Sequence, residues 1–263
     1  MKAFLIDVDK CNGCHNCQIV CKDEHCGNDW SPYAKTQPDS GQFWCKVEEK
    51  VRGTVPLTRI SYIPHIGAQS EAIREFAPEA LMDRDDGLIV IDPEKAKGRI
   101  DIANMFEGVF WNEELGIPQG CTGCAHLLDN GWDVPRCVDA CPTEALRMVD
   151  TDKDASELAS ATKIDSKSNV YYLNYPKRFV GATVVDFDAD EVVIGADVTL
   201  VDASGRVVAS AKTDAFGDFI FKQVEAAAYT VKIASVGYAD KSLEADTTNG
   251  DVNLGDIAFS KNA

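Results

Sequence analysis

Cys11-Asn-Gly-Cys14-His-Asn-Cys17-Gln-Ile-Val-Cys21 is the stretch that decides the fold, because it places four cysteines at the spacing C-x2-C-x2-C-x3-C. A second array repeats this order with a long insertion between its second and third cysteines; it comprises Cys121, Cys124, Cys137 and Cys141, followed by Pro142. The other two cysteines, Cys26 and Cys45, belong to neither array and are interpreted as ordinary buried or partly buried thiols. All the cysteines precede residue 142, whereas a disulfide framework normally ties down a small secreted chain along its whole length. The clustering therefore favours metal ligation in the first half of the chain.

The two arrays together match the ligand pattern of two [4Fe–4S] clusters. In this spacing three thiolates bind one cubane, and the fourth cysteine, on the next helical turn, ligates the other cluster. Pro142 fits the Cys-Pro ending of the pattern and stops the chain coiling back over the site. The sequence therefore predicts crossed ligation, with one cluster held by Cys11, Cys14, Cys17 and Cys141 and the other by Cys21, Cys121, Cys124 and Cys137.

A structural zinc site is the alternative for the second array taken alone, since two cysteine pairs at this separation also suit tetrahedral zinc. The first array argues against it, because zinc rarely requires four cysteines so close together and Cys21 would then lack a partner cluster. His15 and His126 lie beside ligand cysteines, which makes them candidates for a role around a cluster or in a subunit contact. His25 and His65 are interpreted as ordinary core or surface residues.

Composition excludes several classes of protein. The chain has 26 basic and 43 acidic residues, a net charge of −17, which argues against a nucleic-acid partner because phosphate binding depends on Lys and Arg. No apolar run approaches the roughly 20 residues of a membrane helix. The N-terminal apolar run ends too early for a secretory signal. The lack of a secretory signal, together with clusters that are sensitive to oxygen, predicts a cytoplasmic protein. Export together with a partner that carries a signal is the alternative.

Further segments carry a family resemblance: Cys21-Lys-Asp-Glu-His25, Asp86-Gly-Leu-Ile-Val-Ile-Asp-Pro-Glu-Lys-Ala-Lys-Gly98, Val109-Phe-Trp-Asn-Glu-Glu114 and Cys121-Thr-Gly-Cys-Ala-His-Leu-Leu-Asp129. With the arrays, they resemble the iron–sulfur subunits of the bis-molybdopterin (dimethyl-sulfoxide-reductase) superfamily, which fuse two ferredoxin-like modules with four cysteine motifs. The arrays here correspond to the first and last motifs. The resemblance implies a non-catalytic subunit whose two [4Fe–4S] clusters transfer or store electrons. It also implies a large partner subunit that alone carries Mo or W bis-molybdopterin guanine dinucleotide.

The expected chemistry of the complex, again implied by the resemblance, is hydroxyl transfer or hydroxylation of polyhydroxylated aromatics. Two alternatives remain: an electron-relay subunit of another Mo/W bis-pterin oxidoreductase, and a stand-alone two-cluster ferredoxin. The chain itself shows no nucleotide-binding glycine fingerprint and no convincing nucleophile–base set. We therefore expect no active site of its own.

The middle of the chain departs from the family pattern. Ala77-Pro78-Glu-Ala-Leu81 echoes Cys141-Pro142-Thr-Glu-Ala-Leu146 with alanine in place of the ligand, and such an echo indicates a duplicated module. Ala96 and Met105 likewise stand where a third motif would carry cysteines. We therefore expect residues 51–114 to form a degenerate, cluster-free ferredoxin-like module with its emptied pockets refilled by packing. It is inserted into a cluster-binding ferredoxin-like domain made of residues 1–50 and 115–150.

The rest of the chain is predicted to be a linker, 151–176, and an all-β domain, 177–263. The linker stretch is polar and rich in Ser, Asp and Lys at its start. Seven short alternating segments at 8- to 12-residue spacing favour a β-sandwich: 179–187, 196–201, 207–212, 218–221, 229–234, 241–245 and 253–258. Thr213-Asp-Ala-Phe-Gly217-Asp-Phe-Ile-Phe221, followed by Ala228-Tyr-Thr-Val231, resembles the Cna-B or transthyretin-like modules. The fold class is thus α+β, and the sandwich is expected to dock or stabilise.

Overall fold

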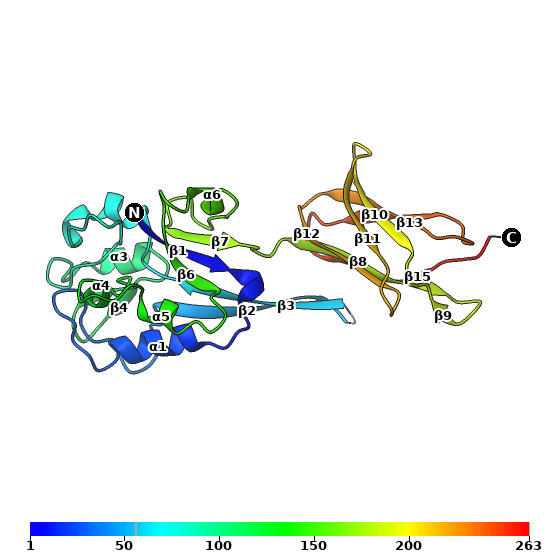
Figure 1. Ribbon diagram of the computed structural model, residues 1–263. Coiled ribbons are helices and arrows are strands. Elements are labelled where there is room, and N and C mark those ends of the chain that lie inside the picture. The colour runs from blue at the N-terminus through cyan, green and yellow to red at the C-terminus, as the bar shows by residue number, and fades with distance from the viewer. Residues whose placement is uncertain (56, 263) are drawn as a thin grey trace. The chain divides into compact units, whose positions relative to one another are not determined.

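The structure, a computed structural model, describes residues 1–55 and 57–262. Pro56 and Ala263, which fall in the predicted middle module and C-terminal domain, lie outside the described residues. The chain forms two compact units (Figure 1). The first combines Met1–Lys50 with Ser61–Tyr175, and the second combines Val51–Ile60 with the chain from Pro176 onward.

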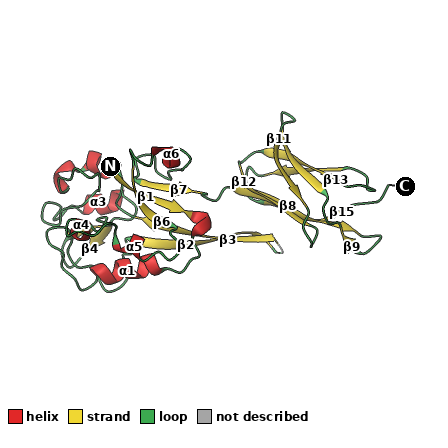
Figure 2. Cartoon of the chain, in the orientation of Figure 1, coloured by secondary structure: helices red, strands yellow, loops and turns green. Residues whose placement is uncertain are grey.

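Short helices and turns surround a three-stranded sheet in the first unit (Figures 1 and 2). The sheet has the order β6-β1-β7, with β1 antiparallel to β6 and parallel to β7. Ala3, Phe4, Leu5 and Ile6 of β1 are at most 1% exposed, so this strand is buried on both faces. The elements that lie in or extend from this unit are β1 (Lys2–Asp7), η1 (Val8–Lys10), α1 (Asn16–His25), β2 (Cys45–Thr54), β3 (Leu57–Ile66), α2 (Glu71–Phe76), η2 (Pro78–Ala80), α3 (Ile100–Met105), β4 (Phe110–Asn112), β5 (Ile117–Gln119), α4 (Ala125–Leu128), α5 (Arg136–Asp139), β6 (Leu146–Asp150), α6 (Ala155–Leu158) and β7 (Val170–Leu173).

Cysteines are part of the main core of this unit. Cys17, Cys21, Cys121 and Cys137 pack in one buried cluster with large apolar side chains such as Phe4 of β1. α1 packs against α5, which brings the two cysteine arrays together although they are far apart in sequence (Figure 1). None of the helices in the described part of the chain is long and apolar enough to cross a membrane.

A separate small core occupies the region in which the sequence lacks the middle cysteine motifs. Ala77 and Ala96 are fully buried and pack with Ile73, Ile102 and other apolar side chains. Both alanines therefore stand in a filled core, in the manner expected of refilled pockets. Met105 does not follow this expectation: it is 61% exposed at the end of α3, where the helix stops and the next residue, Phe106, is extended.

The segment 151–176 is folded, so its assignment as a linker is wrong. It contains α6 and β7, and β7 pairs with β1 in register from Phe4 opposite Val170 to Asp7 opposite Leu173. The four residues of β7 are too few to stand out within a polar stretch, and the strand they pair with, β1, is far away in sequence.

The second unit is a β-sandwich. Its strands are β8 (Arg178–Asp186), β9 (Glu191–Val192), β10 (Asp197–Asp202), β11 (Val207–Lys212), β12 (Asp218–Val224), β13 (Ala228–Ala234), β14 (Lys241–Asp246) and β15 (Val252–Ala258). One sheet has the order β11-β10-β13-β14, and the other has β12-β8-β15 with β9 beside β8. Inward side chains of both sheets, among them Leu200, Val231, Val184 and Phe221, form one buried core. The seven predicted strands are confirmed, and β9 is an additional short one.

The tip of the β2–β3 hairpin belongs to this second unit, which corrects the predicted boundary at residue 51. Arg52 Nη1 lies 3.1 Å from Asp251 Oδ1 and donates a 2.5 Å hydrogen bond to the Lys177 carbonyl oxygen. Asp251 Oδ1 also accepts the Phe179 backbone N–H at 3.0 Å. Both charged side chains are largely buried, with exposed fractions of 15% and 8%. The hairpin tip therefore completes the sandwich through a partner 199 residues away, which no local sequence pattern indicates.

Replacing Arg52 by alanine is expected to lower the free energy of unfolding of the second unit by about 3 kcal/mol, because it leaves the buried Asp251 carboxylate without its cation. Lys212→Ala is the matched control, since Lys212 and Asp197 form an exposed pair whose loss costs at most about 1 kcal/mol. Thermal unfolding of the purified variants measures both. Equal shifts for the two variants would show that the hairpin tip does not stabilise this unit.

Candidate iron–sulfur centre

The first group of thiols lies at the N-terminal end of α1. Cys11 and Cys14 stand in the loop after η1, and Cys17 lies in the first turn of α1. Cys141, two residues after the end of α5, joins them: all four thiols line one small cavity, and the charges of the other three act on Cys11. Cys14 is exposed, and Cys11 and Cys141 are partly exposed. The first group is therefore close to the surface.

The second group is deeply buried. Cys21 of α1 lies beside Cys121 and Cys124, in the loop before α4, and beside Cys137 of α5. None of the four is more than 8% exposed. Cys17 of α1 belongs to the first group, and Cys21, four residues later, belongs to the second. Cys137 of α5 belongs to the second group, and Cys141, four residues later, belongs to the first. The structure thus brings together the two sets that the sequence predicts as ligand sets.

Corresponding backbone loops shape the first half of each array. Gly13 and Gly123 occupy the same place in Cys-x-Gly-Cys and both have positive φ, 70° and 62°. A Cβ on Gly13 would lie 2.5 Å from the Tyr62 ring, so glycine is required there by space as well as by conformation. The Gly123 N–H donates to Cys121 Sγ at 3.3 Å. Such donors stabilise a thiolate, the form that binds iron.

The acid–base chemistry of the buried thiols fits a site for positive charge in the second group. Burial, and after it the charges of neighbouring cysteines, raises the pKa of Cys121 to about 12 and raises the pKa values of Cys21 and Cys124. Burial also raises the pKa of Cys11. Cys17 differs, because a hydrogen bond from the Cys45 thiol lowers its pKa. Four such thiols can ionise together only if positive charge compensates them, which the irons of a cluster supply.

The donor set fits a cubane better than a single ion. Among the described residues, no three His, Cys, Asp or Glu side chains gather closely enough to hold one metal ion. A cubane needs no such close set, because its four thiolates bind four different irons. Two buried polar atoms next to the second group, Thr122 Oγ1 and His126 Nδ1, also have no hydrogen-bond partner in the described protein. Both are groups that could donate to the sulfurs of a bound cluster.

The four histidines are placed differently from one another, and His15, with φ 60°, caps α1 and lines the cavity of the first group. His126 is 7% exposed, its Nε2 lies 3.1 Å from Glu24 Oε1, and the Trp30 ring stacks on it at 4.5 Å. His25 is a core residue, and burial together with His126 lowers its pKa to about 3. His65 pairs with Glu48 at 2.9 Å near the surface. The sequence analysis did not predict that Glu24 is the partner of His126. The available signal was the position of Glu24 on α1, three residues after Cys21.

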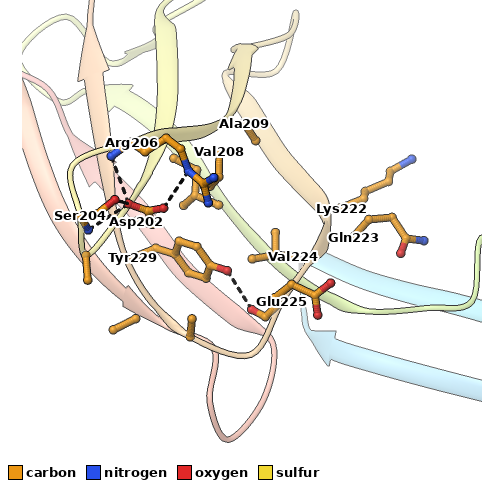
Figure 3. A pocket seen from close by; sticks show the side chains of 14 residues that line it. Asp202, Ser204, Arg206, Val208, Ala209, Lys222, Gln223, Val224, Glu225 and Tyr229 are labelled. Carbon is orange, nitrogen blue, oxygen red and sulfur yellow. Dashed lines mark hydrogen bonds and ion pairs between the residues drawn. The ribbon is translucent and has the colours of Figure 1, made fainter.

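A cavity with a volume of about 570 Å³ lies in the second unit. Figure 3 shows its lining: Arg206 lies against Asp202, and the Tyr229 hydroxyl donates to the Glu225 carbonyl oxygen at 3.2 Å. Hydrogen bonds, first from Ser204, lower the pKa of Asp202 to about 2, so this carboxylate stays ionised and is no general acid. The lining residues include no histidine or cysteine, so we assign no catalytic role to the cavity.

Two family models match parts of the chain. A 4Fe-4S dicluster domain matches residues 69–151, which include the whole second array. A carboxypeptidase regulatory-like domain matches residues 180–260, the β-sandwich. Together with the two groups of four thiols, these matches define the class of the protein: an iron–sulfur protein with an appended β-domain.

Similar proteins narrow the class to a family. The small subunit of pyrogallol hydroxytransferase from Pelobacter acidigallici is 35% identical, over 98% of both chains. A polypeptide of the anaerobic dimethyl sulfoxide reductase of Escherichia coli K12 is 27% identical, and the match covers 54% of this protein and 70% of the relative. A putative dimethyl sulfoxide reductase iron–sulfur subunit from Halobacterium salinarum is 25% identical, and the match covers 65% and 78%. The chain belongs to this family of iron–sulfur subunits of molybdopterin oxidoreductases.

Proposed function

We propose that the chain binds two [4Fe–4S] clusters through crossed sets of ligands. Cys11, Cys14, Cys17 and Cys141 hold the first cluster, and Cys21, Cys121, Cys124 and Cys137 hold the second. The observation that carries this proposal is the grouping itself: each set joins three cysteines of one array to one cysteine of the other. When bound, such clusters take up and release single electrons.

The protein's own residues favour electron transfer or storage over catalysis. Four thiolates saturate each cluster and leave no open coordination position for a substrate. Burial of the second group excludes water, whereas the exposed Cys14 places the first group near the surface. The first group is therefore the point at which electrons enter or leave the subunit. The chain has no active site of its own in this proposal.

The residues between the arrays form, in this proposal, a ferredoxin-like module without clusters. The buried Ala77 and Ala96 support it, since a small apolar core occupies the space around them. The hairpin tip, residues 51–60, is excluded from the module because it belongs to the second unit. The module therefore has no clusters that could carry electrons further through the subunit. This favours short-range electron exchange with one partner over long-range electron relay.

That partner is, in this proposal, a large catalytic subunit carrying a Mo or W bis-molybdopterin guanine dinucleotide. Similarity over 98% of both chains to a pyrogallol hydroxytransferase small subunit supports a complex that transfers hydroxyl groups among polyhydroxylated aromatics. We place the complex in the cytoplasm, where reducing conditions protect such clusters. The sandwich serves as a docking or stabilising module.

Native purification through a tag on this chain tests the partnership. We expect a large subunit containing Mo or W and pterin to co-purify, and the complex to convert pyrogallol by hydroxyl transfer. Metal analysis, mass spectrometry and product analysis are the measurements. A chain that purifies alone, loaded with iron and free of Mo and W, would contradict the partnership and favour a stand-alone ferredoxin.

A further inference from the structure

One end of the β-sandwich exposes several large apolar side chains. Three segments form this end: the turn after β8, β9 with the residues that follow it, and the turn between β11 and β12 (Figure 1). The exposed fraction is 59% for Phe187, 39% for Val192, 63% for Ile194 and 74% for Phe216. Single apolar residues scattered over a surface are normal, whereas several gathered at one place indicate contact with another molecule.

Backbone contacts hold the three segments side by side. β9 pairs with the end of β8. The turn between β11 and β12 lies against both strands: the Gly217 carbonyl oxygen accepts the Val184 N–H of β8 at 2.8 Å, and a Cβ on Gly217 would lie 2.8 Å from Val192 Cβ of β9. Gly217 directly follows Phe216 in this turn. We call this part of the unit the apolar end of the sandwich and define it by Phe187, Val192, Ile194 and Phe216.

Carboxylates surround the apolar end. Residues 186–196 and 213–218 contain six acidic residues and neither Lys nor Arg. Lys261 Nζ lies 3.1 Å from Oδ2 of the buried Asp186. Four exposed carboxylates form no ion pair with any residue that the structure describes: Asp188, Asp190, Glu191 and Asp214. Most of the negative charge at this end is therefore uncompensated.

This charge limits what can cover the apolar end. A second copy of the chain, itself with a net charge of −17, would bring like charges together. The anionic surface of a membrane would repel the same carboxylates. A metal ion does not fit either, because no three carboxylates of the described residues gather closely enough to hold one. An apolar recess rimmed by Lys and Arg on another protein fits both the side chains and the charge.

We propose that the apolar end of the sandwich binds such a recess on the large partner subunit of the complex, with Phe187 and Phe216 as its anchors. Aromatic side chains that fill a pocket contribute much of the binding energy of protein interfaces. The unpaired carboxylates face Lys and Arg at the rim of the recess and steer the two subunits together. The inference rests on the proposed function, which supplies this partner.

The test uses the natively purified complex and matched variants of this chain. Phe187→Ser combined with Phe216→Ser removes both anchors, and Phe216→Ser alone replaces this double variant if the double variant does not fold. Val236→Ser is the control, because Val236 is fully exposed on the same unit in the connection between β13 and β14. Asp188→Asn combined with Asp190→Asn removes charge from the rim. Iron content shows that each variant is loaded, and mass photometry of the diluted complex gives the dissociation constant.

We expect the phenylalanine variant to keep its iron and to raise the dissociation constant about 30-fold, the effect of losing an anchor residue. Val236→Ser should bind like the wild type. The wild-type complex should dissociate more readily at high salt, and the aspartate variant should depend less on salt, because screening acts on the charges that it lacks.

An unchanged dissociation constant in the phenylalanine variant, or an equal rise in Val236→Ser, would overturn the inference. Equal salt dependence of the wild type and the aspartate variant would overturn the basic rim. A wild-type chain that forms dimers by itself, and loses them in the phenylalanine variant, would assign the apolar end to a second copy instead. A wild-type chain that purifies without a large subunit would contradict the proposed function, and the inference with it.

Discussion

Cys141→Ala is expected to remove the cluster bound by Cys11, Cys14 and Cys17, although Cys141 belongs to the other array in the sequence. Its thiol completes the first group, and a cubane with three protein ligands is exposed to solvent at its fourth iron. The variant should therefore lose about half of its iron, about four atoms per chain. The remaining EPR signal should be the one that the variant Cys14→Ala also retains.

Double variants show which cluster is lost. If the ligands are crossed, Cys14→Ala combined with Cys141→Ala loses no more iron than either change alone, because both remove the same cluster. Cys124→Ala combined with Cys141→Ala should lose nearly all of it. The reverse pattern, in which Cys141→Ala adds nothing to Cys124→Ala, would show that each array binds its own cluster.

Removal of iron from the loaded protein with a chelator is expected to abolish the cooperative unfolding transition of the first unit. Cys17, Cys21, Cys121 and Cys137 belong to its main core, so their metal-bound geometry is part of the packing. Without iron the buried thiols are protonated and the space between them is left unfilled. Differential scanning calorimetry of the loaded and stripped protein measures the loss.

The second unit is the internal control for this experiment. Its core consists of apolar residues of β8–β15 and contains no cysteine, so its transition should persist. All four tryptophans of the chain precede residue 133, so tryptophan fluorescence reports on the first unit alone. A stripped protein that keeps both transitions at the loaded temperatures would show that the clusters are not structural.

The cysteine spacing is enough to predict both thiol groups, because the pattern C-x2-C-x2-C-x3-C fixes which turn of a helix carries the fourth cysteine. The alternation of apolar and polar residues is enough to predict the seven main strands of the sandwich. Cys17 and Cys21 lie on α1, and Cys137 lies on α5, a helix of only four residues.

Features that depend on distant partners could not be predicted. β7 is stable because it pairs with β1, and Arg52 is buried because Asp251 lies beside it. The correspondence with a third cysteine motif predicts that Met105 fills an emptied pocket, but such a correspondence does not determine burial, and Met105 is exposed.

Counting iron and acid-labile sulfide in the natively purified complex tests the central claim most directly. Two cubanes require about eight irons and eight sulfides per copy of this chain. We expect this number, with two EPR-active clusters after reduction. A count near four would remove one of the crossed sets. A count near twelve would show that the region around Ala77 and Ala96 binds a cluster, and would contradict the assignment of two clusters and an empty middle module.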